Sequence, residues 1–363
     1  MKIPISERKR EFERYQEEYE EKALEILRSG WYVLGNEVSS FETEFAAWCN
    51  KKECVGVASG LDALKLAFQA IGIEDGDEVL IAGNAYIACV IGITANGGIP
   101  VFVEPDEYYE LDTQQLERHI TPKTKAILAV HLYGQMCQMD KIMEIAQRHG
   151  LYVVEDCAQA HGAKYLGKRA GGYGDISCFS FYPSKNLGGF GDGGAIVTDR
   201  TEFADRIRIL RNYGKSTKYQ NAEAGQNSRL DELQAGLLRV KLRHIEEINE
   251  ERKRIAEFYL GSIKNRKIIL PRQYAGAQAV WHLFVIRCEE RAKLAEYLEG
   301  KGIGFDYHYP IPPHLSEAYA YLGRKKGDLP LTEKYADEVL SIPIFNGMGQ
   351  KEMEYVVDMI NAF

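Results

Sequence analysis

Residues 178–195 read CFSFYPSKNLGGFGDGGA, a short apolar run followed by Lys185 and then by a stretch rich in glycine. Ordering so many glycines costs much conformational entropy, which argues against a loop that only connects two elements. Upstream, residues 152–156 read YVVED, so an apolar strand ends in the carboxylate of Asp156. A lysine that can form a Schiff base and an acid that keeps a pyridine nitrogen protonated are the two groups that a pyridoxal phosphate enzyme supplies. The pattern predicts such an enzyme, an aminotransferase, with Lys185 as its catalytic residue.

Short β-branched runs alternate with helical stretches through the first two thirds of the chain. The runs are residues 54–58, 79–82, 101–104, 126–132, 152–156, 178–181 and 195–198. This alternation predicts an α/β protein with a mostly parallel sheet and helices on both faces. One amphipathic helix is expected before the sheet, over residues 12–29. A long charged helix over about 233–259 marks a change of pattern, so we expect a large domain at 1–230 and a smaller C-terminal domain at 231–363.

The composition is that of an ordinary globular protein, with 45% hydrophobic and 27% charged residues in a chain of 363. The net charge of −8 argues against wide contact with nucleic acid, although a small anionic substrate needs only a local basic pocket. No apolar run is long enough to span a bilayer, and none resembles the core of a signal peptide. The seven cysteines form no CxxC pair, which indicates reduced, packed thiols in a cytoplasmic protein. His131 and His161 have no ligand companions at useful spacing, so no metal site is expected.

In a sheet of this kind, ligands bind where strands end and helices begin. Gly60 and Leu61 open the helix after the first strand, where N–H groups can bind a phosphate. The alternative is a simple helix cap, with Ser59 or Asp62 satisfying the first turn. Tyr86 begins the next helix, and its ring can either stack on the pyridine or belong to the core.

Two further residues flank the reactive pair. Gln159 can hydrogen-bond the phenolic oxygen of the cofactor or merely solvate its loop, and Ser180 has a hydroxyl suited to the phosphate. The reactive residues also have plainer interpretations. Asp156 can cap the segment 158–160, and Lys185 can be a surface lysine in a flexible loop.

The order of the motifs resembles the nucleotide-sugar aminotransferases of the DegT/StrS type over nearly the whole chain. The motifs are GWYVLG (30–35), SGLDAL (59–64), GDEV (76–79), EDCAQAHG (155–162), FSFYPSKNLG (179–188), RNYG (211–214) and NSRLDELQ (227–234). That family has the aspartate aminotransferase fold, which is fold type I of the pyridoxal phosphate enzymes. The resemblance therefore implies a large, mostly parallel sheet domain and a smaller C-terminal α/β domain.

The resemblance also implies roles for individual residues. Lys185 bonds to the cofactor, and Asp156 pairs with the pyridine nitrogen. Asn227 reaches the cofactor phosphate of the neighbouring subunit, which implies a homodimer with shared active sites. The cofactor-binding residues expected from the sequence and the resemblance together are Gly60, Leu61, Tyr86, Asp156, Gln159, Ser180 and Asn227.

Two positions depart from the commonest pattern of the family. Ser184 stands where glycine is usual, and Leu61 stands where threonine is frequent, so Leu61 offers only its backbone to a phosphate. Sugar dehydratases of this fold have histidine in place of the lysine. Lys185 therefore argues against that chemistry.

Residues 191–195 and 308–314 look more like the members that act on dTDP-linked 3-keto-6-deoxyhexoses than like those that act on 4-keto sugars. The expected reaction moves an amino group from L-glutamate to C-3 of the sugar and gives a dTDP-3-amino-3,6-dideoxyhexose. Amination at C-4 is the alternative, and glutamate is implied only by the resemblance. The expected substrate-binding residues are Lys218, Tyr219, Arg229, His308 and Tyr309.

Functions of other classes remain open at this point. The chain can be a non-catalytic regulator that binds pyridoxal phosphate on a borrowed enzyme fold, because a fold does not determine a function. It can also be a pyridoxal-phosphate-dependent dehydratase or racemase. The joint presence of Lys185, Asp156 and Gln159 favours the aminotransferase.

Overall fold

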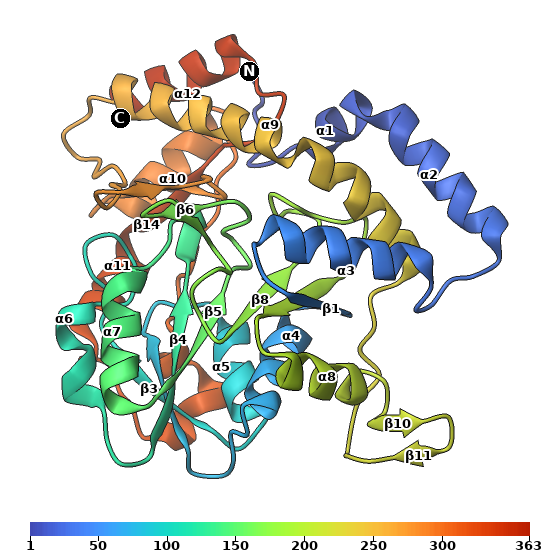
Figure 1. The fold of residues 1–363 in the computed structure, drawn as a ribbon. Coiled ribbons are helices and arrows are strands. Elements are labelled where there is room, and N and C mark those ends of the chain that lie inside the picture. The colour runs from blue at the N-terminus through green and yellow to red at the C-terminus, as the bar shows by residue number, and fades with distance from the viewer.

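The computed structural model describes residues 1–363, with a seven-stranded sheet in the larger of its two parts (Figure 1). The strand order is β1-β9-β8-β5-β4-β2-β3. Strands β8, β5, β4, β2 and β3 are parallel, whereas β9 is antiparallel to both β8 and β1. The prediction of a mostly parallel sheet is therefore confirmed. The strands are β1 (Glu53–Val57), β2 (Glu78–Ala82), β3 (Ile99–Val103), β4 (Thr124–Val130), β5 (Tyr152–Asp156), β8 (Ile176–Ser180) and β9 (Gly194–Thr198).

Helices cover both faces of this sheet, as the strand–helix alternation predicts. One face packs against α4 (Gly60–Ala70), α5 (Ile87–Thr94) and α8 (Thr201–Leu210). The other packs against α3 (Asn36–Trp48), α7 (Met139–His149) and the first half of α9 (Glu232–Ser262). Shorter elements complete this part: α6 (Thr113–Leu116), the 3-10 helices η1 (Glu117–His119) and η2 (Leu132–Gly134), and the strands β6 (Lys164–Tyr165), β7 (Lys168–Arg169), β10 (Lys215–Thr217), β11 (Gln220–Asn221) and β12 (Ala277–Gln278).

The alternation of side chains along each strand builds two separate cores. In β4, Ile127 and Ala129 pack into one hydrophobic cluster, while Ala126, Leu128 and Val130 pack into the other. Successive side chains of a strand point to opposite faces, so a strand that is apolar at every position must be covered on both sides. This is why the central strands read as unbroken apolar runs.

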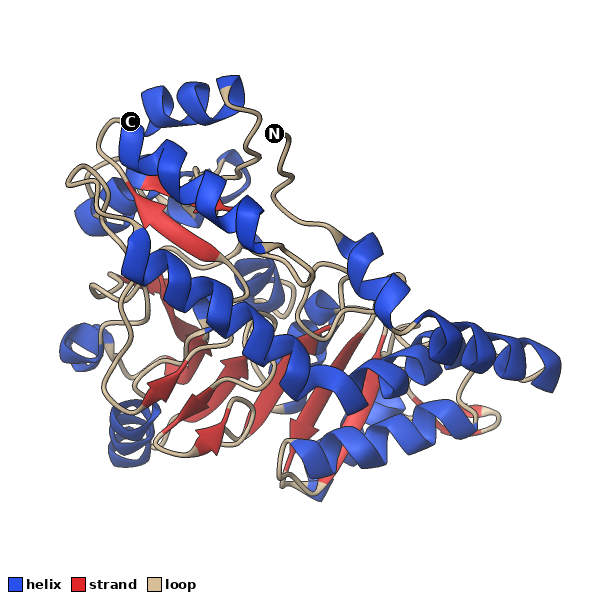
Figure 2. Ribbon diagram, turned by 90° about the horizontal axis from the view of Figure 1, so that it is seen from above, coloured by secondary structure: helices blue, strands red, loops and turns tan.

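A third core lies in the smaller C-terminal part, which carries both chain termini (Figure 2). It is formed around the antiparallel pair β13 (Phe284–Arg287) and β14 (Val339–Ile342). Helix α9 joins the two parts, because Leu238 and Ile245 lie in the core of the large part and Ile255 and Tyr259 in the third core. The other helices here are α10 (Arg291–Gly300), η3 (Pro313–Leu315), η4 (Glu317–Leu322), α11 (Pro330–Glu338) and α12 (Gln350–Ala362).

The N-terminal segment differs from the single helix expected over residues 12–29. It forms two helices, α1 (Arg8–Arg14) and α2 (Gln16–Ser29), with a break at Tyr15, whose φ of −121° and ψ of 22° are not helical. The buried Tyr15 ring stacks on His244 of α9 at a centroid distance of 4.1 Å. Spacing alone misses this break because the contact that favours it is remote in sequence.

All seven cysteines are buried, as expected for packed thiols, and none forms a disulfide. No helix in the structure combines the length and the apolarity needed to cross a membrane.

Glu155, the penultimate residue of β5, is a fully buried carboxylate. Its Oε1 accepts hydrogen bonds from the Gly174 amide at 2.7 Å and the Ser177 hydroxyl at 2.9 Å, and its Oε2 lies 3.0 Å from His131 Nε2. The sequence suggests no companion for His131, whereas the structure places both Glu155 and Cys157 within 4.8 Å of it. Both Glu155 oxygens are already engaged by donors from the protein, so this group holds the loop before β8 against the sheet.

The environment of Glu155 predicts its contribution to stability. Burial alone raises the pKa of Glu155, but the hydrogen bonds from His131 and the backbone outweigh it and lower the pKa to about 2, from an ordinary value of 4.5. A lowered pKa stabilises the fold fully above about pH 4.5 and progressively less as the pH falls towards 2. Glu155→Gln should therefore lower the free energy of unfolding at pH 7 by roughly 3 kcal/mol.

Urea denaturation of the wild type and the variant at pH 7 and at pH 4 measures this difference, which should be smaller at pH 4. Glu144→Gln on α7 is the matched control, since Glu144 is exposed and should change stability by less than about 0.5 kcal/mol. Equal effects of the two substitutions at pH 7 would contradict the role of Glu155.

Candidate active site

A cleft of about 540 Å³ lies where the two parts of the chain meet. The carboxyl ends of β5 and β8 and the first turns of α4 and α5 contribute to its lining from the large part. The smaller part contributes His282, His308 and residues 344–346, and the N-terminal segment contributes residues 5–8 and Glu11. Of the residues expected to bind cofactor or substrate, nine line this one cleft: Gly60, Leu61, Tyr86, Asp156, Gln159, Ser180, Lys185, His308 and Tyr309.

Lys185 lies in the turn after β8, where its N–H donates to the Tyr182 carbonyl at 2.8 Å. Its side chain is half-buried in the cleft and forms no ion pair within the chain. Burial lowers the pKa of Lys185 to about 8, even though the charge of Asp156 acts in the opposite direction. A lysine in this state is partly deprotonated near neutral pH, which a nucleophile or proton carrier requires. The alternative of a solvated surface lysine is wrong for this residue.

Asp156 ends β5 and is buried. Its Oδ1 accepts a hydrogen bond from the Ala158 amide at 2.9 Å, so the capping interaction considered from the sequence does occur. Its Oδ2 accepts a hydrogen bond from the Cys89 thiol at 2.9 Å. The carboxylate has no cationic partner within hydrogen-bond distance, yet it lines the cleft that contains Lys185. A capping role and a role towards a ligand cation are therefore compatible.

The N-terminus of α4 faces the end of β8 at very short range. A Cβ atom on Gly60 would lie 2.5 Å from Cβ of Ser180, so only glycine allows this approach. Ser59 caps the helix through its hydroxyl, which accepts from the Asp62 amide at 3.1 Å. The amides of Gly60 and Leu61 belong to the first turn, where no helical carbonyl can accept from them. Together with the Ser180 hydroxyl they form a set of donors suited to a phosphate.

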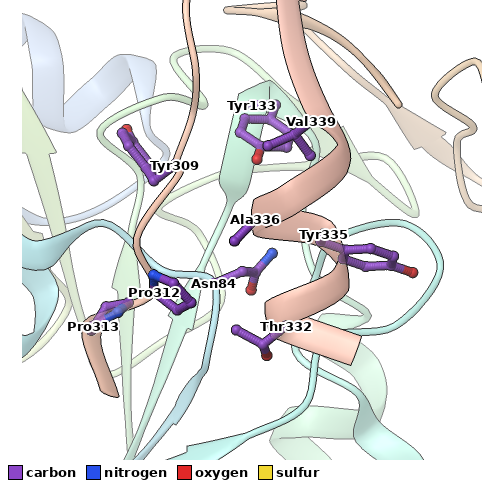
Figure 3. Close-up of a pocket in the computed structure, with 9 residues that line it drawn as sticks. All are labelled: Asn84, Tyr133, Tyr309, Pro312, Pro313, Thr332, Tyr335, Ala336 and Val339. Carbon is purple, nitrogen blue, oxygen red and sulfur yellow. The ribbon is translucent and has the colours of Figure 1, made fainter. Parts of the chain in front are cut away.

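Gln159 and two tyrosines form one wall of the cleft. Gln159 Oε1 accepts from the Tyr133 amide at 2.6 Å, and its Nε2 donates to the Tyr309 hydroxyl at 3.0 Å. The Tyr309 ring lies 4.9 Å from the ring of Tyr86, measured between centroids. Tyr309 also lines a neighbouring cavity of about 10 Å³ (Figure 3), together with Asn84, whose buried Oδ1 has no hydrogen-bond partner. That space is sufficient for about one water molecule.

Four of the expected residues lie outside this cleft. Asn227 and Arg229 line a second cavity of about 420 Å³, and Lys218 and Tyr219 lie on the exposed hairpin of β10 and β11. Asp192 lines both cavities, so the two lie next to each other. Within one chain, the structure does not bring these four residues into the cleft of Lys185.

The cleft also contains residues that the sequence reasoning missed. Arg252 is buried and donates to the carbonyls of Trp281, His282 and Ile344. His282 Nδ1 lies 3.2 Å from Oδ1 of Asn186, which directly follows Lys185. The place of Asn186 in the cleft could have been predicted, because it directly follows Lys185. No comparable signal existed for Arg252 and His282, because their place depends on how the smaller part docks.

Comparisons with known proteins agree with this geometry. The model of the DegT/DnrJ/EryC1/StrS aminotransferase family matches residues 13–361. A dTDP-3-amino-3,6-dideoxy-alpha-D-galactopyranose transaminase from Aneurinibacillus thermoaerophilus is 48% identical over 351 residues, which cover 96% of each chain. A dTDP-3-amino-3,4,6-trideoxy-alpha-D-glucose transaminase from Streptomyces venezuelae is 45% identical and covers 100% of this chain and 96% of its own. The crystal structure of S. venezuelae DesV in complex with a ketimine intermediate has a TM-score of 0.97 at 45% identity, covering 99% of this chain and 98% of DesV.

These similarities extend over both parts of the chain and include the cleft between them. The fold is that of the aspartate aminotransferase-like, type I pyridoxal phosphate enzymes, as the motifs imply. The protein belongs to the DegT/DnrJ/EryC1/StrS aminotransferase family, and it is a transaminase.

Proposed function

We propose that this protein uses pyridoxal 5'-phosphate to move the amino group of L-glutamate to C-3 of a dTDP-linked keto-6-deoxyhexose. The products are 2-oxoglutarate and a dTDP-3-amino-3,6-dideoxyhexose. The observation that carries this proposal is the convergence in one cleft of Lys185, with its lowered pKa, the buried Asp156 and the donor set at the start of α4.

Besides Lys185, the residues of the cleft fit this cofactor at two points, its phosphate and its ring nitrogen. The amides of Gly60 and Leu61 and the Ser180 hydroxyl can hold the phosphate, and the short approach at Gly60 leaves the space in front of them open to it. The Asp156 carboxylate, which has only neutral donors, lacks the cationic partner that a protonated ring nitrogen would provide. Pyridoxal phosphate supplies the aldehyde that takes up the amino group and a ring that accepts electrons.

The chain's own groups then perform the remaining tasks. Lys185 moves the proton to and from the carbon that loses or gains nitrogen, because its pKa of about 8 allows both protonation states near neutral pH. Gln159 fixes the Tyr309 hydroxyl through a 3.0 Å hydrogen bond, and Tyr86 presents its ring beside Tyr309. These side chains orient the reacting groups and exclude water.

The choice of C-3 is supported by the relatives and by the motifs at 191–195 and 308–314. Both relatives are named for 3-amino sugars, although one of those sugars also lacks the 4-hydroxyl. Their products share the dTDP carrier, the 6-deoxy carbon and the nitrogen at C-3. His308 lines the cleft and is held by the Ser341 hydroxyl at 2.7 Å from Nδ1, which suits it to contact the hexose.

The residues outside the cleft support a homodimer with shared sites. The cavity that contains Asn227 and Arg229 is bordered by the exposed Val33, and the exposed Tyr213 lies beneath the Arg229 guanidinium at 5.7 Å. Exposed apolar groups around a polar cavity are typical of an interface between subunits. We infer that Asn227 of the partner subunit binds the cofactor phosphate, and that Lys218 and Tyr219 of the partner subunit contact the pyrophosphate and base of the substrate.

A panel of substrates tests the proposed reaction. The protein is incubated with L-glutamate and with dTDP- or GDP-linked 3-keto and 4-keto hexoses, and the products are identified by mass spectrometry. We expect amination of the dTDP-linked 3-keto sugar and an equal amount of 2-oxoglutarate. The Lys185→Ala variant should remain folded, lose the visible absorbance of bound pyridoxal phosphate and form no amino sugar, because both the covalent anchor and the proton carrier are removed.

The same experiment separates the alternatives. Exclusive amination of a 4-keto sugar would mean that the protein aminates C-4 of the sugar and not C-3. A yellow protein that aminates no sugar would favour a regulator, and absence of glutamate-dependent pyridoxamine phosphate would favour a dehydratase or racemase. Near wild-type turnover by Lys185→Ala would contradict the assignment of Lys185.

Asp156→Asn should bind the cofactor but lower kcat by about a thousandfold or more, because a neutral amide does not keep the ring nitrogen protonated. Steady-state kinetics with the aminated sugar and the absorbance of the bound cofactor measure the two effects separately. A loss of less than about tenfold would leave Asp156 as a capping residue only.

Mixing two inactive variants tests the shared site. One carries Lys185→Ala and the other carries Asn227→Ala with Lys218→Ala. Each mixed dimer should have one site with all defects and one site with none, so equal mixing should restore about a quarter of the wild-type rate. No recovery despite demonstrated subunit exchange would mean that each chain completes its own site.

A further inference from the structure

The Cys89 thiol lies against the carboxylate that the proposed reaction requires. Cys89 Sγ donates to Oδ2 of Asp156 at 2.9 Å, and Cys89 is fully buried. The other carboxylate oxygen accepts from the Ala158 amide at 2.9 Å. Each oxygen of Asp156 thus has one neutral donor within the chain. Cys89 does not line the cleft, so it acts on a ligand only through Asp156.

The place of Cys89 is determined by the packing of α5. A Cβ atom on Gly92 would lie 2.7 Å from Cβ of Leu64, so α5 and α4 approach closely at this point. The Cys89 amide donates to the Tyr86 carbonyl at 3.0 Å and closes the first turn of the helix. Residues three apart share one helix face, so a single turn presents both the Tyr86 ring and the Cys89 thiol towards the site. The same packing connects this turn to the helix whose N-terminus faces the phosphate position.

The thiol is suited to act only as a donor. Burial, and then the charge of Asp156, raise the pKa of Cys89 well above its ordinary value, so the proton stays on sulfur. A donor to a carboxylate stabilises its ionised form, and the effect is strong where water is excluded. If the hydrogen bond is lost, the proton shared by Asp156 and a ring nitrogen moves towards Asp156.

We propose that Cys89 is a positioning residue for amino transfer, whose thiol hydrogen bond orients Asp156 and supports its pairing with the protonated ring nitrogen of the cofactor. This inference rests on the proposed function, because it assigns Asp156 to the ring nitrogen. The simpler interpretation is that Cys89 is a small core residue, as its neighbours in the same hydrophobic cluster are.

Cys178 provides a matched control for that interpretation. It lies opposite Asp156 on the neighbouring strand β8, is buried in the same cluster, and makes no side-chain hydrogen bond to a carboxylate. Cys178→Ala removes the same sulfur volume beside Asp156 as Cys89→Ala does, but it removes no donor. Cys89→Ser differs from Cys89→Ala only in its hydroxyl and restores a donor.

The test uses holoenzyme loaded with pyridoxal phosphate labelled with ¹⁵N in the ring, because the ¹⁵N chemical shift reports protonation of that nitrogen directly. Cys89→Ala should move the signal towards the unprotonated ring and lower kcat by about tenfold. Cys89→Ser should return the signal and should bring kcat to within about threefold of the wild type. Cys178→Ala should lower the thermal midpoint as much as Cys89→Ala and leave the signal in place.

An unchanged ring signal in Cys89→Ala, with a loss of thermal stability equal to that of Cys178→Ala, would overturn the proposal. If Cys89→Ala does not fold, the pair Cys89→Val and Cys89→Thr repeats the comparison with side chains of nearly equal volume. The Asp156→Asn variant shows whether a negative result concerns only the role of Cys89 or the proposed function as well. A signal that moves in Asp156→Asn but not in Cys89→Ala refutes only the role of Cys89, whereas a signal that moves in neither refutes the pairing of Asp156 with the ring.

Discussion

Strand β5 ends with two adjacent buried carboxylates, and the alternation of its side chains sends them to opposite faces of the sheet. Glu155 faces the side covered by α3 and α7, where it is held by His131 and by the loop before β8. Asp156 faces the side covered by α4 and α5, where it meets Cys89 and the cleft. One strand therefore supplies an anchor to the scaffold and an acid to the site.

Burial in the cleft affects both Lys185 and Asp156. It lowers the pKa of Lys185 to about 8 and so makes the amine reactive. It also leaves Asp156 largely buried, with an amide and a thiol as its hydrogen-bond partners in the chain. A ligand that places a cation beside Asp156 and bonds to the amine of Lys185 would offset the cost of burying both groups. The cleft therefore offers a negative charge to the cationic ring nitrogen of pyridoxal phosphate and an amine to its aldehyde.

Most of the fold could be predicted from the sequence because its causes are local. The runs that became β4, β5 and β8 are apolar at consecutive positions, which is what a strand buried on both faces requires. The break at Tyr15 could not be predicted, since it is associated with a stacking contact with His244 more than two hundred residues away. In the site, too, positions that depend on contacts remote in sequence could not be predicted. Lys185 and Asp156 carry local signals, whereas Arg252 and His282 enter the cleft only through the docking of the smaller part.

The charges of the cleft give a physical reason for a second chain. Besides Lys185, two arginines line the cleft: the exposed Arg8, and the buried Arg252, whose guanidinium is already engaged by three backbone carbonyls. A sugar nucleotide carries a pyrophosphate, and the carboxylates of Glu7, Asp192 and Asp306 also line the cleft. Further cations occur on the exposed hairpin of β10 and β11, where Lys215 and Lys218 pair with no acid. An interface that places this hairpin of one subunit over the cleft of the other would add positive charge beside the substrate. The −8 chain would then hold an anionic substrate partly through positive charge contributed by a second subunit.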